Sequence, residues 1–537
     1  IAQWCASFRQ HLYQPESMFD IVQSSSRQRE ILDVFLRYGW DYMRQLLTLG
    51  RADRVEVPPP AILRNILTDL GPVYVKLGQL LSTRPDLLPP EYIEALSSLQ
   101  SNVPVVPPSE IAAFIHGQLP QPPETIFAQI DYHAIAAGSI AQTHRATLKD
   151  GQLVAIKVQR PGIDLTVSRD ISLLKKVAEL VSGTEFGKQY EIVSLAEEFS
   201  TALTAELDFT QEANYTELLR HNLSQSKWFD PDRIVVPKIY RQLTTPKLLV
   251  MDWLDGDSIL TAHIDGKAYN GDPNAEKKAL TTLAFRAFFQ QYLVDGFFHA
   301  DPHPGNLFYL ADGRLAILDC GMMGRIDPRT QTVLIEMVLA IIDLDAQRCT
   351  QLTLQLADAT RPVDLFQLER DYERLLRKYG NLSLDNINAS QAFYEILQAA
   401  RKNYLRWPSN IGLFAKSLAN LEGAGRQFYP AVNIMTEIKP LMTDMFQRQL
   451  LGDNPLQSVL RTALEFKNLS LESPRQFSFL LDRLSSETLR LNLKIQDLDL
   501  LRLSLDDAAN RRSFSTLVGS LVIGAAIIST AASTPEM

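Results

Sequence analysis

Three polar residues with a fixed spacing, Asp301, Asn306 and Asp319, constrain this chain more than any other feature. Asp301 and Asn306 stand five residues apart in HADPHPGN, and Asp319 follows thirteen residues later in LAILDCG. The apolar run before Asp319 is typical of a buried strand that ends in an aspartate and a glycine. Carboxylate and amide oxygens suit Mg²⁺, which stays partly hydrated and is shared with phosphates. The spacing predicts one aspartate that orients a nucleophile and an Asn–Asp pair that holds Mg²⁺.

Such a set is the layout of a kinase-type phosphoryl-transfer site. The competing interpretation is a zinc site made by His299 and His303, which stand four residues apart. That spacing suits zinc on a helix, but Pro302 and Pro304 break a helix there. We therefore favour Mg²⁺ and expect His299 to be a structural residue of the loop, while the side-chain role of His303 stays open.

A lysine inside an apolar strand is a second candidate for the site. Lys157 lies in LVAIKVQ, directly after a predicted hairpin with its turn at Asp150 and Gly151. A buried ammonium is costly unless an anion pairs with it. The sequence thus predicts either a buried Lys157 with an acidic partner or an edge-strand lysine that faces water.

Two segments around this hairpin predict the rest of a nucleotide site. The loop AAGSIAQT, residues 136–143, has glycine only at the middle position of the kinase pattern GxGxxGxV. Alanine narrows the allowed backbone and adds methyl groups near the phosphates, so nucleotide should bind differently than under a glycine loop. The stretch LLVMDWLDG, residues 248–256, reads as a hinge that contacts adenine, or else as a strand and a surface turn. The predicted nucleotide contacts are Ala136, Ala137, Gly138, Ser139, Asp252, Trp253 and Leu254.

The order of the predicted elements indicates an α+β chain with more than one domain, as its 537 residues also require. Within the small lobe, the segments at 233–240 and 247–254 each read as a strand. The predicted parts are a helical N-terminal extension at 1–129, a small β-rich lobe with inserted helices at 130–255, a larger helical lobe at 256–450, and C-terminal helices at 451–512.

The segment at 513–534 carries no charged side chain and is rich in Ala, Ser, Thr and Gly. About 20 residues of helix span a hydrocarbon core of ~30 Å, so a C-terminal transmembrane helix is predicted, with a buried hairpin or core helix as the alternative. Arg511 and Arg512 precede the segment and Glu536 follows it. The positive-inside rule then puts the large N-terminal part on the cytoplasmic side, or its stromal or matrix equivalent.

Composition excludes some other classes. The formal net charge is −9, and no basic stripe supports a nucleic-acid partner. The three cysteines, Cys5, Cys320 and Cys349, are far apart and form no disulfide framework, which favours a reducing compartment.

Together these segments resemble the UbiB family, the aarF-domain kinase-like proteins. The alanine-rich loop is one of its signatures. KLGQ, Lys76 to Gln79, is similar to the KxGQ motif of the family's N-terminal extension. ELD, Glu206 to Asp208, and then Glu212 in AELDFTQEANY match the ExD motif and the helix glutamate. The resemblance runs from about residue 60 to 330 with every signature in order, and more loosely to 450. It implies a bilobal protein-kinase-like fold.

The resemblance also implies a role for each residue of the predicted catalytic centre. Lys157 pairs with Glu212 and holds the α- and β-phosphates of ATP. Asp301 takes the catalytic-loop position, and Asn306 and Asp319 hold Mg²⁺.

The same resemblance implies a regulatory group in which Lys76 and Gln79 lie over the active site, near Glu206 and Asp208. Without it, Lys76 would be read as a solvated lysine. The chain departs from the protein-kinase pattern at Cys320, where DFG has Phe, and at Ala300, where HRD has Arg.

The implied activity is that of an Mg²⁺-dependent atypical kinase or ATPase. It would bind ATP and support prenylquinone metabolism of the ubiquinone, plastoquinone or tocopherol type at a membrane. Its partners would be membrane lipid or a prenylquinone precursor, together with proteins of quinone biosynthesis. The alternatives are a protein kinase acting in trans and a non-catalytic, nucleotide-gated lipid-binding module. After Gly321 only MMGRI precedes the next predicted helix at Asp327 and there is no APE motif, which argues against a peptide substrate.

Overall fold

The computed structural model describes residues 59–84, 87–99, 104–183, 191–380 and 388–432, with a few isolated positions outside these ranges. These residues belong to one compact unit. The predicted helices at 451–512, the predicted membrane helix at 513–534 and most of the first 58 residues lie outside the described part. Within the described part, no helix is both long enough and apolar enough to cross a membrane.

From residue 59 on, the N-terminal extension is a group of short helices that each begin with proline. Proline suits the first helical position because its fixed φ is helical and its missing N–H would have no partner there. Leu67, Leu70 and Val73 of these helices form one core with Phe199 and Leu203 of α11, which fixes the extension against the small lobe. The helices are α4 (Pro60–Leu70), α5 (Pro72–Leu81), α6 (Pro90–Ser97), α7 (Pro108–Gln118) and α8 (Pro123–Ile126).

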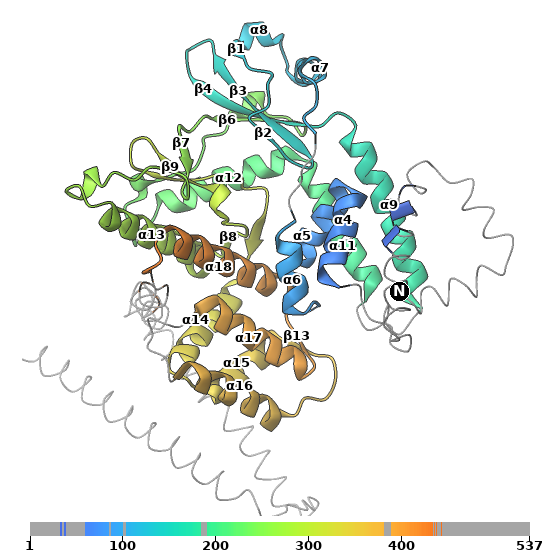
Figure 1. Cartoon of the computed structure of the whole chain (residues 1–537), viewed down its shortest axis with the longest axis vertical. Coiled ribbons are helices and arrows are strands. Elements are labelled where there is room, and N and C mark those ends of the chain that lie inside the picture. Colours follow the sequence, from blue (N-terminus) through green and yellow to red (C-terminus); the bar gives the residue numbers. More distant parts are fainter. Residues whose placement is uncertain are drawn as a thin grey trace, which may run out of the picture. The chain divides into compact units, whose positions relative to one another are not determined.

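The small lobe is built on an antiparallel sheet with the order β1-β3-β4-β6, and β2 pairs with β3 (Figure 1). The predicted hairpin is confirmed, with Thr143 opposite Lys157 and Gly151 at a φ of 90° in the turn. Ile111 and Ile115 of α7 pack against the sheet. The strands are β1 (Phe127–Ile130), β2 (Ala136–Ala137), β3 (Ala141–Leu148), β4 (Leu153–Gln159) and β6 (Leu248–Asp252).

As predicted, helices lie between β4 and β6 in the part of the chain that the structure describes. They are α9 (Ile163–Ser182), α11 (Ile192–Glu206) and α12 (Phe209–Ser224). Phe209 and Ala213 of α12 pack against Ala141 and Leu249 of the sheet. This packing brings the first turn of α12 close to the middle of β4.

The prediction of a small-lobe strand at 233–240 is wrong. Only Ile234–Val235 form a strand, β5, which pairs in parallel with β10 of a second sheet. Pro237 has no N–H to donate to a ladder, and after it only Ile239 forms an isolated bridge to Met251.

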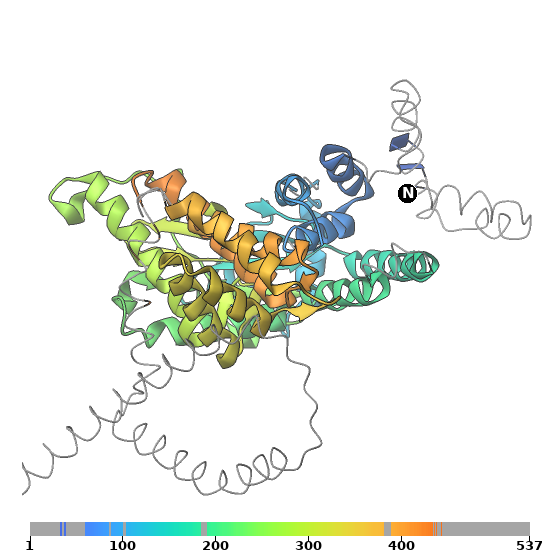
Figure 2. The same cartoon turned by 90° about the horizontal axis from the view of Figure 1, so that it is seen from below.

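The large lobe packs its helices around an aromatic core. Its second sheet has the order β5-β10-β9-β7, and the orange helix α18 in Figure 2 packs against α13, α17 and β11. The largest fully buried side chains include Phe285, Phe288, Tyr292, Phe298 and Phe414. The helices are α13 (Pro273–Gln290), α14 (Pro328–Ile342), α15 (Ala346–Leu356), α16 (Leu365–Gly380), α17 (Ala389–Lys402) and α18 (Ser409–Phe428), with a π-helical turn η4 (Gln291–Asp295) and 3-10 turns η1 (Pro231–Arg233), η2 (Arg241–Leu243), η3 (Lys267–Tyr269) and η5 (Pro304–Asn306). The strands are β7 (Gly256–Ser258), β8 (Phe297–His299), β9 (Leu307–Leu310), β10 (Leu315–Ile317), β11 (Met323–Arg325), β12 (Asp358–Ala359) and β13 (Leu405–Arg406).

The segment between Asp319 and the next helix is short, and it contains a strand of the large lobe. Its strand β11 pairs antiparallel with β8, and the backbone N–H of Ala300 donates to the carbonyl of Met322. The next helix, α14, begins at Pro328, where the side chain of Asp327 caps it. In a protein kinase, the segment that follows this aspartate can bind a peptide substrate. Here a strand of the large lobe takes the place of that segment.

A candidate phosphoryl-transfer site

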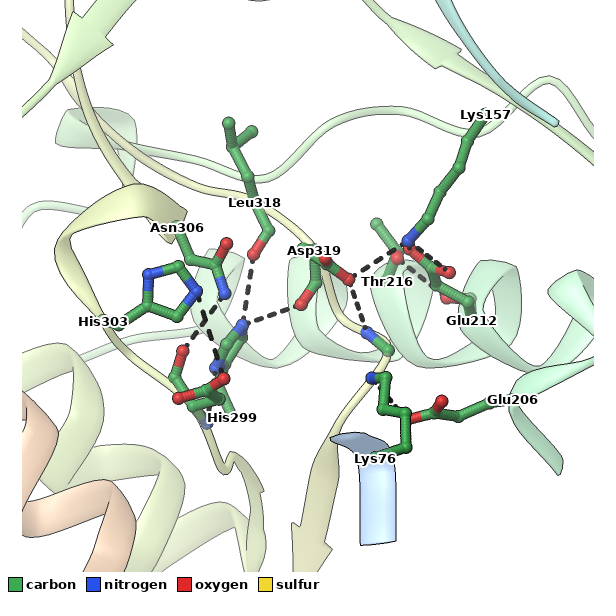
Figure 3. A network of polar contacts seen from close by, with 12 residues as sticks. Lys76, Lys157, Glu206, Glu212, Thr216, His299, His303, Asn306, Leu318 and Asp319 are labelled. Atoms are coloured by element: carbon green, nitrogen blue, oxygen red, sulfur yellow. Dashed lines mark hydrogen bonds and ion pairs between the residues drawn. The ribbon is translucent and has the colours of Figure 1, made fainter. Parts of the chain in front are cut away.

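Lys157 and Glu212 form a close ion pair between the sheet and α12 (Figure 3). The Lys157 Nζ lies 2.7 Å and 2.9 Å from the two carboxylate oxygens of Glu212. Strand β4 is paired on both sides, and the Lys157 side chain is only 18 % exposed. The edge-strand alternative for this lysine is therefore excluded.

Asp319 joins the same network from the large lobe. Its Oδ1 lies 3.2 Å from the Lys157 Nζ and accepts a hydrogen bond of 3.2 Å from the backbone N–H of Gly321. Asp319 has a φ of 52°, a left-handed conformation that is sparsely populated and that occurs at functional sites. Its side chain is 52 % exposed, so the carboxylate is open to a ligand.

The charges of this network stabilise one another. The Lys157 ammonium holds the pKa of Asp319 well below its usual range, and the charge of Lys76 adds to this. Burial disfavours the charged form of Lys157, but Asp319 and Glu212 outweigh that effect and raise its pKa. Burial raises the pKa of Glu212, and Lys157 offsets part of the rise. Lys157 and Asp319 are thus both charged at neutral pH.

His299 is a buried structural residue of the loop, as expected. Its Nε2 faces the carbonyls of Leu318 and Asp319 at 3.1 Å and 3.0 Å, and its Nδ1 accepts from the backbone N–H of Asp301 at 3.2 Å. Burial lowers the pKa of His299, so the ring is neutral with its proton on Nε2. With both nitrogens used by the backbone, His299 has no lone pair left for zinc.

The side chain of His303 has a local role that the sequence left open. Its Nδ1 accepts a hydrogen bond of 3.0 Å from the backbone N–H of Gly305 and so caps the 3-10 turn η5. Its Nε2 lies 4.0 Å from Asp301 Oδ2. Across the described residues, His, Cys, Asp and Glu form no group of three that could hold a metal. The zinc interpretation is not supported by this geometry.

Asp301 and Asn306 lie in one loop, as their spacing predicts. The Nδ2 of Asn306 donates to the backbone carbonyl of Asp301 at 3.1 Å, so its Oδ1 is the side-chain atom that could bind a metal ion. Asp301 Oδ1 accepts a hydrogen bond of 2.8 Å from the Nδ2 of Asn420 on α18. The Asp301 carboxylate remains 30 % exposed, so an acceptor can reach it.

Sequence reasoning missed the contribution of α18 to this loop. The Ser417 Oγ donates to the backbone carbonyl of His299 at 2.6 Å, in addition to the Asn420 contact with Asp301. The available signal was the stretch AKSLAN, in which Lys416, Ser417 and Asn420 interrupt the apolar run of IGLFAKSLANL. These polar positions recur at helical spacing and so share a face.

The predicted regulatory residues are brought together only in part. Lys76 on α5 donates to Glu206 Oε1 at 2.9 Å. Burial disfavours the charged form of Lys76, but Glu206 raises its pKa overall and Asp319 adds to the rise. Gln79 donates instead to the backbone carbonyl of Leu99 at 3.0 Å. Asp208 caps α12, where its Oδ1 accepts from the backbone N–H of Thr210 at 2.9 Å. The ExD motif thus supplies one ion-pair partner and one helix cap.

Arg160 fixes the alanine-rich loop through hydrogen bonds to backbone carbonyls. The guanidinium donates to the carbonyls of Gly138 at 2.9 Å and Pro104 at 2.7 Å. The backbone N–H of Gly138 donates to the carbonyl of Ala141 at 2.8 Å, while Ala136 and Ala137 form β2. Ser139 is buried, so its hydroxyl is a poorer candidate for a phosphate contact than the sequence predicts.

The predicted hinge uses two of its three amides internally. The backbone N–H groups of Asp252 and Trp253 donate to the carbonyls of Lys238 and Leu153 at 3.0 Å and 3.1 Å. The amide of Leu254 has no such partner in the described part of the chain. Among the predicted adenine contacts, Leu254 is the one whose N–H is free to bind a base.

Comparison with known proteins gives the family. The ABC1 atypical kinase-like domain matches residues 98–353, and the UbiB helical domain matches residues 372–433. An uncharacterised protein of Synechocystis sp. is 57% identical over 408 residues, which are 76% of this chain and 100% of that protein. The probable protein kinase UbiB of Azotobacter vinelandii is 32% identical over 431 residues, which are 77% of this chain and 78% of that protein.

A plant relative extends the set. Protein ACTIVITY OF BC1 COMPLEX KINASE 7, chloroplastic, of Arabidopsis thaliana is 30% identical over 441 residues, which are 81% of this chain and 62% of that protein. The α+β kinase-like fold expected from the resemblance is confirmed by the ABC1 domain match. The chain belongs to the UbiB/ABC1 family of atypical kinase-like proteins.

Proposed function

We propose that this protein is an Mg²⁺-dependent ATPase or small-molecule kinase that supports prenylquinone metabolism at a membrane. The observation that carries the proposal is the continuous network from Glu212 through Lys157 to the exposed carboxylate of Asp319. Such a lysine–glutamate pair beside a metal-binding aspartate is what kinase-type sites need in order to bind and orient ATP.

The residues present suit both ATP and Mg²⁺. Lys157 would hold the α- and β-phosphates, while Asn306 Oδ1 and the Asp319 carboxylate would hold the metal ion. The low pKa of Asp319 keeps that carboxylate charged at neutral pH, as a metal ligand must be. When bound, Mg²⁺ neutralises charge on the phosphate oxygens.

Asp301 would orient the acceptor and take its proton. Asn420 and the loop backbone hold this aspartate, and its partial exposure lets a small acceptor reach it. General-base positioning by a fixed carboxylate is the expected contribution in this class of site. Leu254 would contact the adenine edge through its N–H.

Water or a small or lipid acceptor fits the site better than a peptide. Strand β11 pairs with β8 directly after the Asp319 segment, and α14 follows at once. The pair between Lys76 of the extension and Glu206 of α11 would add a regulatory contact next to the Asp319 carboxylate. We infer that the extension restrains turnover and that Lys76 is its acting residue.

The membrane role rests on the family and on the C-terminal segment at 513–534. We propose that this segment anchors the protein, with the catalytic part on the cytoplasmic side or its stromal or matrix equivalent. Membrane lipid or a prenylquinone precursor would then reach the site from the bilayer, together with partner proteins of quinone biosynthesis.

Phosphate release from ATP tests this function. The full chain is assayed with Mg²⁺, with and without vesicles, and with and without a prenylated phenol as a quinone-precursor probe. We expect Mg²⁺-dependent hydrolysis that vesicles or the phenol increase, and a loss of at least about 100-fold in Asp301→Asn. Asp312→Asn, on an exposed turn of the large lobe, is the matched control.

Two results would contradict the proposal. Hydrolysis that is equal in wild type and Asp301→Asn would show that this carboxylate takes no part in the chemistry. Strong phosphorylation of a protein substrate, lost in Asp301→Asn, would favour a protein kinase acting in trans.

A further inference from the structure

Helix α18 lies against the catalytic loop and carries Lys416, which has no part in the function proposed above. Its Ser417 and Asn420 hydrogen-bond the loop at the His299 carbonyl and the Asp301 carboxylate. Lys416 directly precedes Ser417 and stands one helical turn before Asn420. Residues four apart share a helix face, so Lys416 lies on the side of α18 that meets the loop.

The electrostatic surroundings of Lys416 agree with this position. Burial lowers the pKa of Lys416, the charge of Asp301 opposes that, and the charge of Lys76 adds to it. The Lys416 ammonium is therefore close enough to both residues to feel their charges.

Lys416 differs from the other lysines of the site in having no partner. Lys157 is paired with Glu212 and Asp319, and Lys76 is paired with Glu206. For Lys416, no hydrogen bond or ion pair with another described residue is formed. Lys416 is only partly exposed. A partly buried ammonium without an anion is costly, so this group is suited to receive one from a ligand.

The catalytic loop itself offers no cation for the transferred group. The stretch DPHPGN, from Asp301 to Asn306, contains no lysine or arginine. Phosphoryl transfer spreads negative charge over the equatorial oxygens of the transferred group, and fixed cations there stabilise the transition state. Lys157 serves the α- and β-phosphates in the proposed function, so the γ-phosphoryl group still needs a protein cation.

We propose that Lys416 is a catalytic residue whose ammonium contacts the γ-phosphoryl oxygens of bound ATP. This inference rests on the proposed function and deepens it, because it gives the UbiB helical domain a direct part in the chemistry. As the acceptor oxygen bonds to the γ-phosphorus, the bond to the β–γ bridging oxygen breaks and the acceptor proton passes to Asp301. Lys416 neither gains nor loses a proton in this step.

Binding of two nucleotides tests the proposal without turnover. Affinities for Mg²⁺–ADP and for a non-hydrolysable Mg²⁺–ATP analogue are measured by calorimetry on the full chain. In Lys416→Met we expect the affinity for the ATP analogue to fall at least about tenfold, since one charge-assisted hydrogen bond is lost. The affinity for ADP should stay within about twofold of wild type, because ADP lacks the γ-phosphoryl group.

Three further variants distinguish the loss of the Lys416 charge from a general effect on folding. Lys416→Arg should restore most of the preference for the ATP analogue, because it keeps the charge. Lys416→Gln should repeat the loss with a polar side chain. Lys402→Met on α17, where the lysine side chain is 70 % exposed, is the matched control and should change neither affinity.

The outcomes separate this inference from the proposed function. Equal weakening of both nucleotides, or no weakening of either, in Lys416→Met and Lys416→Gln would overturn the role of Lys416 and leave the ATP site standing. Absence of binding of either nucleotide to wild type would overturn both proposals.

Discussion

Two lysine–glutamate pairs lie near Asp319, and they differ in how they are held. Lys157 uses both carboxylate oxygens of Glu212 and also contacts Asp319. Lys76 uses only one oxygen of Glu206, and the other oxygen is buried with no hydrogen-bond partner in the described part of the chain. A half-satisfied buried carboxylate costs about 1–3 kcal/mol relative to a satisfied one. The Lys157–Glu212 ion pair is thus suited to stay closed, and the Lys76–Glu206 ion pair is suited to open.

The elements that carry the pairs explain this difference. Lys157 and Glu212 come from a central strand and from the helix that packs on it, so the sheet itself sets their distance. Lys76 and Glu206 come from α5 of the extension and from the end of α11. The second pair can open without disturbing the sheet, which is what a regulatory contact requires.

Removal of the first pair should give the largest effect. Lys157→Met should weaken Mg²⁺–ATP binding by at least about 30-fold and lower the free energy of unfolding by about 3 kcal/mol, because Glu212 is left buried without its cation. Calorimetry and urea denaturation measure the two effects. Binding within a factor of two of wild type would remove Lys157 from the nucleotide site.

Removal of the second pair should act on turnover and not on binding. In Lys76→Ala we expect ATP hydrolysis or autophosphorylation to rise about 3- to 10-fold, with nucleotide affinity changed less than about threefold. The control is Glu198→Gln, which breaks the ion pair of 2.8 Å between Arg84 and Glu198 and so loosens the same packing away from Asp319. A rise that is equal in the control, or no rise in Lys76→Ala, would end the gating role of Lys76.

Double-mutant cycles should show that the Lys157–Glu212 pair contributes more to stability than the Lys76–Glu206 pair. We expect a coupling energy of about 3 kcal/mol between Lys157 and Glu212, and of about 1 kcal/mol or less between Lys76 and Glu206. The unsatisfied Glu206 oxygen offsets part of the gain in the second pair. Denaturation of the single and double variants measures both values, and equal coupling would contradict the contrast between the pairs.

The pH dependence should show almost no effect from either lysine near neutrality. The acidic partners raise the pKa of Lys157 and of Lys76 despite burial. A raised folded-state pKa means that the stabilisation is fully present below the unfolded value of about 10.4 and is lost only as pH rises further. ADP affinity of wild type should therefore be flat from about pH 6.5 to 9. A decline centred near pH 8 would show that one of the lysines is not paired as described.

The part of the site that lies close together in sequence could be predicted. Asp301 and Asn306 belong to one loop, and Asp319 follows the hairpin of β9 and β10 that comes directly after it, so their spacing reflects the local backbone. The hairpin before Lys157 is equally local, because Asp150 and Gly151 define its turn. The partnership of Lys157 with Glu212, 55 residues apart, came from the resemblance and not from spacing.

The remaining contacts depend on packing that no local pattern encodes. Asn420 reaches Asp301 across 119 residues, and Arg160 reaches Pro104 across 56 residues. Strand β5 pairs with β10 of the second sheet, and beyond Pro237 the same segment forms a bridge from Ile239 to Met251 of the first sheet. Gln79 shares a motif with Lys76, but its amide satisfies the carbonyl of Leu99.

Magnesium-dependent ATP binding by Asp319→Asn tests the central claim most directly. Calorimetry compares wild type, Asp319→Asn and the exposed control Asp312→Asn, each with and without Mg²⁺. We expect wild type and Asp312→Asn to bind ATP only weakly without Mg²⁺, and Asp319→Asn to lose at least about 100-fold of the Mg²⁺-dependent affinity. Mg²⁺-dependent binding that is unchanged in Asp319→Asn would contradict the assignment of the site.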